Sequence, residues 1–164
     1  MAAETQTAHP GLALVDKMYA CFAKGDMATL KSEVFASDIT WNLPGHHPLS
    51  GIKHGPDEVI AFFAALMQTG IVVDNVHFGE MQEGSPSLSL DRATAHASDD
   101  GVVERHTGHG KLKNGEEIIF PTCSYYRIHN GRIAEVQVYT GDQHNVDRYF
   151  WAMYDLKPIP DRLG

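Results

Sequence analysis

Apolar side chains recur at helical spacing in three segments of the first seventy residues. The first segment predicts a helix over residues 11–23, which Lys24-Gly25 ends because Gly readily adopts the left-handed conformation of a helix cap. Asp26 belongs to a residue type favoured as an N-cap and predicts a short second helix. The third helix opens at Gly55-Pro56, where Pro fits the first turn, and ends at Gly70.

The remaining segments follow the patterns of strands and turns. Residues 38–43 alternate polar and apolar side chains, which predicts a strand with Trp41 on its buried face. Residues 44–51 are rich in Pro and Gly and predict a loop. Further on, Asp-Gly and Asn-Gly pairs favour hairpin turns between successive strands. We expect these strands over residues 71–81, 88–97, 102–112, 117–128 and 133–140, and a short closing helix over 146–156.

This order of elements predicts a single α+β domain. Helices followed by an antiparallel run of strands are typical of a curved sheet with its helices gathered on one side. The chain has 164 residues, which is the size of one compact domain. We therefore expect one domain over residues 1–164, with a core of about 11–142 and a C-terminal tail over 143–164.

Charge and cysteine content limit the partners and the cellular compartment that we expect for the protein. The chain has 13 Lys and Arg against 21 Asp and Glu, and this net charge of −8 disfavours nucleic-acid binding. No stretch approaches the roughly 20 apolar residues of a membrane span, and residues 1–10 lack the pattern of a secretory signal. Cys21 and Cys123 form no CxxC pair and indicate free thiols in a reducing compartment. We expect a cytoplasmic protein without a nucleic-acid or membrane partner.

A series of short motifs runs through nearly the whole chain. They are Tyr19–Phe22, Gly25-Asp26, 36–41, Pro44-Gly45, 48–51 and Gly55 with 59–63, followed by 102–105, Asn114-Gly115, 127–133 and Tyr139. In this order, over about residues 12–142, they resemble the SnoaL-like proteins of the nuclear-transport-factor-2-like superfamily. Relatives in that superfamily include polyketide cyclases, ketosteroid isomerases and limonene epoxide hydrolases. The resemblance implies a cone-shaped, curved antiparallel sheet wrapped around three N-terminal helices, with a mostly apolar pocket inside and a short C-terminal helix.

The resemblance also implies a homodimer. In this fold the outer face of the sheet commonly packs against a second copy. We expect Val103, Ile119 and Val136 to lie on that exposed face.

Two of the related activities lack their residues here. The oxyanion donor of ketosteroid isomerases falls near Met18, and the carboxylate base falls near Asn42 or Leu43, neither of which takes a proton from carbon. Arg105 matches the arginine of limonene epoxide hydrolases, but their two carboxylate positions fall at Thr107 and near Val138. The resemblance therefore predicts neither the isomerase mechanism nor the unmodified hydrolase mechanism.

The candidate catalytic residues are Asp142, Arg105 and His109. Asp142 lies near the aspartate that SnoaL-like cyclases use as acid and base. Alternation along a strand places Arg105, Thr107 and His109 on one face and Glu104 and His106 on the other. The resemblance implies that the first set lines the cone. Asp142 or a histidine would then move a proton, and Arg105 would stabilise charge on an oxygen.

Two of these candidates, Arg105 and Asp142, have a structural alternative. Arg105 would pair with a glutamate if it lay on the outer face, as exposed ion pairs commonly do. Asp142 would be the N-cap of the closing helix.

The expected pocket residues share an apolar or aromatic body, or a place at the mouth of the cone. The substrate-binding set that we expect is Trp41, Tyr19, His46, Phe63, Thr107 and Tyr126. His106 and His109 fall on opposite faces of a strand, and the chain lacks a CxxC pair, an HExxH helix and a Gly-rich phosphate loop. These observations predict chemistry without a metal or another cofactor.

The sequence thus favours a cofactor-free acid/base enzyme, namely an isomerase, a cyclase or a dehydratase. Its substrate would be a hydrophobic oxygenated small molecule such as a polyketide or terpenoid intermediate. One alternative is a non-catalytic ligand-binding or dimerisation domain. A third interpretation is an epoxide hydrolase in which Asp142 and His109 replace the missing carboxylates. Inward polar groups that pair only with each other would favour binding, whereas an unpaired carboxylate or imidazole in the pocket would favour catalysis.

Overall fold

A computed structural model describes residues 9–68, 73–74, 77–78, 87–98 and 101–154 of the chain. The first half contains α1 (Pro10–Lys24), α2 (Met27–Thr29), the π-helical segment η1 (Leu30–Val34), β1 (Phe35–Leu43), β2 (Gly51–His54) and α3 (Gly55–Gln68). The second half contains β3 (Val73–Asp74), β4 (His77–Phe78), β5 (Ser87–Ser98), β6 (Gly101–Lys111), β7 (Glu117–His129), β8 (Arg132–Thr140) and α4 (Gln143–Ala152). None of the helices in these ranges is long and apolar enough to cross a membrane.

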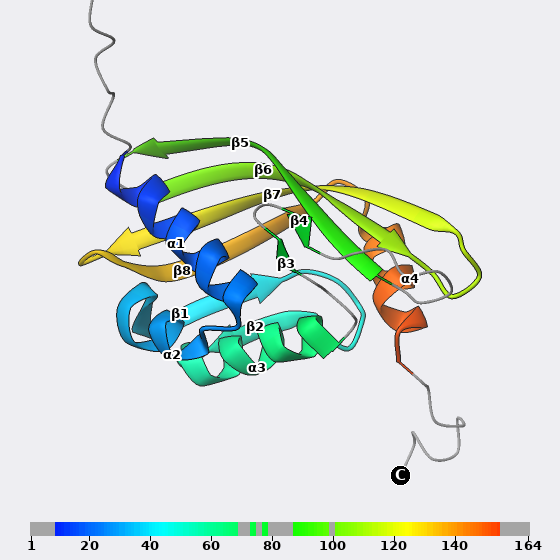
Figure 1. Ribbon diagram of the computed structural model, residues 1–164, viewed down its shortest axis with the longest axis horizontal. Coiled ribbons are helices and arrows are strands. Elements are labelled where there is room, and N and C mark those ends of the chain that lie inside the picture. Colours follow the sequence, from blue (N-terminus) through cyan, green and yellow to red (C-terminus); the bar gives the residue numbers. More distant parts are fainter. Residues whose placement is uncertain (1–8, 69–72, 75–76, 79–86, 99–100, 155–164) are drawn as a thin grey trace, which may run out of the picture.

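Six of the strands form one curved sheet in the order β2-β1-β8-β7-β6-β5. Figure 1 shows this sheet arching over α1, α3 and α4, which all lie on its concave side. The predicted α+β cone is confirmed. The sheet is mixed rather than wholly antiparallel, because β1 and β8 run parallel. Hairpin turns impose antiparallel pairing only on strands that follow each other directly, and β1 and β8 are not joined by one.

Local signals place the ends of the first helices correctly. Gly25 has a φ of 68° and ends α1 in the left-handed conformation. Its N–H donates to the carbonyl of Phe22, and the N–H of Asp26 donates to the carbonyl of Cys21. The Asp26 side chain then accepts the N–H of Thr29 at 3.0 Å and caps α2. The predicted helix break and N-cap are both confirmed.

The strand predictions agree less closely before residue 87. Within the strand expected over residues 71–81, the structure has two short paired strands, β3 and β4, and the other residues of that range lie outside the described ones. The predicted hairpin at Asn130-Gly131 is confirmed, since both residues have positive φ values of 50° and 70°.

The hydrophobic core fills the space between the concave face of the sheet and the helices. Trp41 points inward from β1, as predicted, together with Ile39 and Leu43 on the same face. Val103 and Ile119 are exposed on the outer face, as expected, but Val136 is only 1% exposed. The expectation for Val136 is wrong because alternation along β8 turns Tyr139 outward and Val136 inward. The homodimer itself stays a prediction.

Candidate active site

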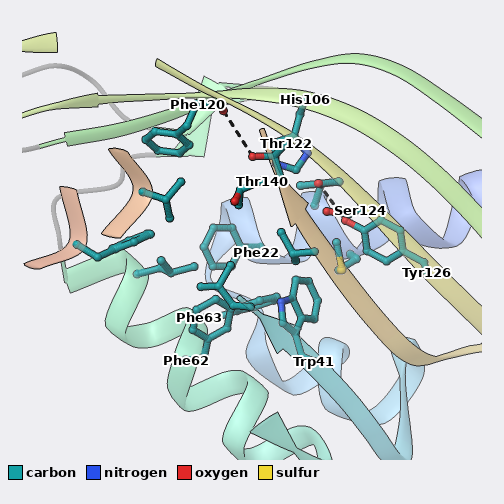
Figure 2. Close-up of a pocket in the computed structure, with 17 residues that line it drawn as sticks. Phe22, Trp41, Phe62, Phe63, His106, Phe120, Thr122, Ser124, Tyr126 and Thr140 are labelled. Carbon is teal, nitrogen blue, oxygen red and sulfur yellow. Dashed lines mark hydrogen bonds between the residues drawn. The ribbon is translucent and has the colours of Figure 1, made fainter. Parts of the chain in front are cut away.

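A cavity of about 140 Å³ lies between the sheet and helices α1, α3 and α4 (Figure 2). Aromatic and aliphatic side chains form most of its wall. They are Met18, Phe22, Trp41, Leu43, Phe62, Phe63, Leu66, Phe120, Val138, Val146 and Phe150. In Figure 2, Trp41, Phe62 and Phe63 lie on the opposite side of the cavity from His106 and Thr122. The cavity is therefore apolar on the side formed by β1 and α3 and carries polar groups on the side formed by β6 and β7.

Those polar groups come from neighbouring strands in register. His106 on β6 pairs with Thr122 on β7, and Glu104 on β6 pairs with Ser124 on β7. His106, Thr122 and Ser124 line the cavity, together with Tyr126 and Thr140. Paired positions on one face of a sheet bring their side chains together, so the sheet builds a compact polar roof over the apolar cavity.

At the centre of this roof lies the Glu104 cluster, which consists of Tyr19, Glu104, His106 and Tyr126. The Glu104 side chain is completely buried. Its Oε1 atom accepts hydrogen bonds from the hydroxyl of Tyr19 and from the hydroxyl of Tyr126 at 3.2 Å. Oε1 also lies 2.9 Å from Nδ1 of His106. The two tyrosine hydroxyl oxygens are themselves 3.2 Å apart. A buried carboxylate requires such partners, because an isolated charge is strongly disfavoured away from water.

The two tyrosines act as hydrogen-bond donors in this cluster. Burial and the charge of Glu104 raise the pKa of Tyr126 well above its usual value. Burial, followed by the neighbouring Tyr126 and Glu104, raises the pKa of Tyr19 in the same direction. Both phenols therefore keep their protons near neutral pH and direct them to the carboxylate.

His106 has one nitrogen turned to the carboxylate and the other turned to the cavity. A carboxylate accepts hydrogen bonds, so Nδ1 carries the proton of the neutral ring and Nε2 carries the lone pair. Nε2 of His106 makes no hydrogen bond to the described residues. It is also absent from the polar atoms that are fully buried without a partner, so it is open to the cavity that His106 lines. Nε2 is therefore a base on the surface of an apolar cavity, oriented by a buried carboxylate.

The other carboxylate oxygen of Glu104 is different. Oε2 is buried by protein atoms and has no hydrogen-bond partner in the structure. All three donors of the cluster converge on Oε1, the oxygen beside the imidazole. Oε1 is therefore the atom that fixes the orientation of the His106 ring.

The structure reverses the predicted faces of β6. Arg105 is exposed, and Thr107 and His109 are half-buried on the outer face, so none of the three lines the cavity. Glu104 and His106, expected outside, point inward. Alternation separates these two sets but does not say which one is buried. Lys111, which shares the outer set, is the signal that would have oriented the strand, since lysine is rarely buried.

Asp142 takes the structural alternative considered for it. Its Oδ1 accepts the N–H of Asn145 at 3.0 Å, and its Oδ2 accepts the side-chain amide of the same residue at 2.7 Å. It is the N-cap of α4 and does not line the cavity. Local sequence therefore accounts for this aspartate by helix capping.

The expected substrate-binding residues divide into two groups. Tyr19, Trp41, Phe63 and Tyr126 line the cavity. His46 and Thr107 do not, and the His46 side chain is 96% exposed. Within the described ranges, no group of three or more His, Cys, Asp or Glu side chains is placed to hold a metal ion.

His47, the neighbour of His46, packs against the cavity wall from outside. Its ring stacks on Phe150 at 4.7 Å between centroids, and its Nδ1 accepts the N–H of Leu49. Burial lowers the pKa of His47, and Lys53 and His46 act in the same direction, whereas Asp147 opposes them. The folded protein therefore resists protonation of a ring that takes up a proton readily after unfolding.

This difference predicts that the free energy of unfolding decreases as pH falls below the ordinary histidine pKa of 6.5. One such group contributes at most about 1.4 kcal/mol per pH unit. In His47→Asn, which keeps an acceptor for Leu49 but does not titrate, urea unfolding between pH 7 and 5 should show a shallower decrease. The matched control is His129→Asn, at an exposed position on β7, and equal slopes in wild type and His47→Asn would contradict the prediction.

A cone-shaped sheet with an interior cavity is the nuclear-transport-factor-2-like fold. Solved structures of nuclear-transport-factor-2-like proteins share this fold with the chain. Within this class, the SnoaL-like domain family matches residues 15–136, and the chain belongs to that family.

Individual relatives extend this likeness over most of the chain. The uncharacterized protein Rv0034 of Mycobacterium tuberculosis is 28% identical over 144 residues, which is 86% of this chain and 95% of that protein. The structure of Bal32a from a soil-derived mobile gene cassette has a TM-score of 0.68 at 22% identity, covering 86% of this chain and 96% of its own. A putative SnoaL-like polyketide cyclase from Jannaschia sp. CCS1 has a TM-score of 0.62 at 15% identity, covering 93% and 99%. At these identities the two solved structures establish the fold alone.

Proposed function

We propose that the protein is a cofactor-free acid/base enzyme of the isomerase, cyclase or dehydratase type, acting on a hydrophobic oxygenated small molecule. The observation that carries this proposal is the Glu104–His106 pair, which presents an imidazole base to an apolar cavity. Such a pair performs the two tasks that acid/base catalysis requires, because the imidazole moves the proton while the carboxylate holds the ring in one orientation.

The proton balance is simple for all three reactions. Nε2 of His106 takes a proton from a C–H or O–H group of the substrate, and the substrate keeps the electron pair. In an isomerisation or a cyclisation, the imidazolium returns the same proton to another atom of that molecule. In a dehydration it gives the proton to a departing hydroxyl group, which leaves as water. None of these steps needs an oxidant, a reductant or a second substrate.

Membership of the SnoaL-like family supports this proposal, and so does the likeness to the putative SnoaL-like polyketide cyclase from Jannaschia. Fold alone does not determine function, and for that reason the proposal depends on the cavity and on the Glu104 cluster.

A second candidate is a non-catalytic ligand-binding domain. One observation favours it, namely that the donors of the Glu104 cluster are all satisfied inside the protein. The lone pair of His106 Nε2 on the cavity surface favours catalysis instead. The epoxide hydrolase with a rearranged triad is not assembled, because Arg105 and His109 lie on the outer face and Asp142 caps α4.

A thermal-shift screen followed by turnover measurements tests the proposed function. Purified protein is screened against cyclic ketones, alcohols, phenols, epoxides and aromatic polyketides. A ligand at 100 times its dissociation constant stabilises the fold by about 2.7 kcal/mol, which produces a clear shift. Each hit is then incubated with the protein and followed by NMR. We expect at least one hit to be converted, whereas binding without conversion across all hits would favour the ligand-binding alternative.

A further inference from the structure

The volume of the cavity indicates the size of the group that it can enclose. At about 140 Å³ it is close to the apolar cavity of about 150 Å³ that holds one benzene molecule in another protein. Its aromatic wall is tightly packed, since the ring of Phe63 lies 4.8 Å from that of Phe22 and 5.0 Å from that of Trp41. Close-packed walls of this kind resist enlargement. The cavity therefore fits a ligand with one six-membered ring.

The lining residues also limit the charge of the ligand. Among the described residues that form the wall, none is Asp, Glu, Lys or Arg. A charged ligand would lose its hydration without gaining a counter-charge, which is strongly disfavoured. An anion would in addition be repelled by Glu104, which lies directly behind the roof. These conditions favour a neutral ligand.

The hydrogen bonds of the roof determine which polar group fits. The hydroxyls of Tyr19 and Tyr126 and the Nδ1 hydrogen of His106 are all directed to Glu104. Three further hydroxyls are also engaged. Thr140 donates to Gln143, Thr122 makes a long contact of 3.5 Å with the carbonyl of Phe120, and Ser124 hydrogen-bonds to the hydroxyl of Tyr126.

The cavity surface is thus left with acceptors rather than donors. The indole N–H of Trp41 has no partner, but protein atoms cover it. Among these acceptors, Nε2 of His106 has a fixed orientation, because the contact of Nδ1 with Glu104 holds the ring. A ligand that carries a hydroxyl hydrogen complements this site, whereas a ligand with only a carbonyl oxygen does not.

From size, charge and hydrogen bonding we propose that the site takes a neutral single-ring alcohol or phenol, which donates its hydroxyl hydrogen to Nε2 of His106. This inference rests on the proposed function for the role of His106, but it concerns binding and is measurable without turnover. It names the substrate class as compact monocyclic alcohols and phenols rather than polycyclic molecules.

Isothermal titration calorimetry with matched probes tests this inference. 4-Methylphenol differs from toluene by one hydroxyl, 4-methylbenzoate adds a charge, and a three-ring anthracenol adds two rings. We expect the wild-type protein to bind 4-methylphenol about tenfold more tightly than toluene. We expect it to bind the benzoate and the anthracenol at least tenfold more weakly than 4-methylphenol. Tighter binding of either of these two probes would overturn the inference.

The variant His106→Asn separates the hydroxyl contact from the shape of the cavity. The Asn amide still reaches Glu104 from the position of Nδ1, but no atom replaces Nε2. The preference for 4-methylphenol over toluene should fall to about onefold, while the affinity for toluene stays within about twofold of wild type. His106→Gln, which places an amide near the position of Nε2, should restore part of the preference. An unchanged preference in both variants would overturn the inference.

The outcomes also distinguish this inference from the proposed function. Selective binding of 4-methylphenol through His106, with no conversion of any hydroxyl-bearing ligand, would contradict the catalytic proposal alone. Conversion of a polycyclic ligand by a protein that does not prefer 4-methylphenol would contradict the substrate class alone. The exposed His129 on β7 supplies the control, since His129→Asn should keep the wild-type preference.

Discussion

Turnover falls by a factor of about 10²–10⁴ when His106 is replaced by Asn, if this histidine moves the proton. The Asn side chain keeps a donor for Glu104, so the buried carboxylate stays partnered and the fold is expected to persist. The base on the cavity surface is lost at the same time. The measurement is kcat on a substrate found by the screen, with the melting temperature recorded for each protein.

Two further variants sharpen this prediction. His129→Asn makes the same chemical change at an exposed position on β7 and should leave kcat at the wild-type value. Asp142→Asn tests the catalytic role that the sequence suggests for Asp142 against the role that the structure suggests for His106. Asn is also a good N-cap, so this variant should preserve α4. A loss of turnover in Asp142→Asn with unchanged turnover in His106→Asn would contradict the role given to His106.

Removal of the indole in Trp41→Ala should lower the free energy of unfolding by about 3–5 kcal/mol. Trp41 is 7% exposed and packs against the rings of Phe62, Phe63 and Tyr126 at centroid distances of 6.1, 5.0 and 6.2 Å. The truncation would therefore extend an existing cavity, and its rigid aromatic neighbours would not close the gap. Native proteins have about 5–15 kcal/mol of stability in total, so a large part of it would be lost. Urea unfolding followed by circular dichroism provides the measurement.

The second tryptophan supplies the matched control. Trp151 on α4 is 38% exposed, and its indole N–H donates to the carbonyl of His46. Trp151→Ala removes the same atoms but loses one exposed hydrogen bond and little burial, so we expect a decrease of about 1 kcal/mol. If Trp151→Ala destabilised the protein as much as Trp41→Ala, the structural interpretation of the cavity wall would be wrong.

The sequence predicts the features of this fold that depend on neighbouring residues. Gly25 and Asp26 mark the end of one helix and the start of the next, because each acts within a single turn of chain. Asn130-Gly131 marks a hairpin, since its two residues tolerate positive φ. Trp41 alternates with polar neighbours and is correctly placed inside. Pairing between distant strands is not local, which explains why the parallel contact of β1 and β8 was not predicted.

For the candidate site, too, the sequence predicts local features but not those that depend on long-range packing. Alternation grouped Glu104 with His106 and Arg105 with His109, but the choice between the two faces depends on how β6 packs against the rest of the molecule. The same limit explains Asp142, whose catalytic and capping interpretations fit the sequence equally well until α4 is seen to begin after it. Family resemblance did not decide the face either, because it implied that Arg105 lines the cone and the structure places Arg105 on the outer face.

By itself, the sequence determined the order of the elements, the α+β class and the residues that alternate together on each strand, because these follow from steric and hydrophobic rules over a few positions. Only the tertiary structure decided that Tyr19 meets Glu104, 85 residues away, and that three donors converge on one buried carboxylate oxygen. Such a contact depends on the curvature of the whole sheet and on the packing of α1 beneath it, which no local pattern encodes.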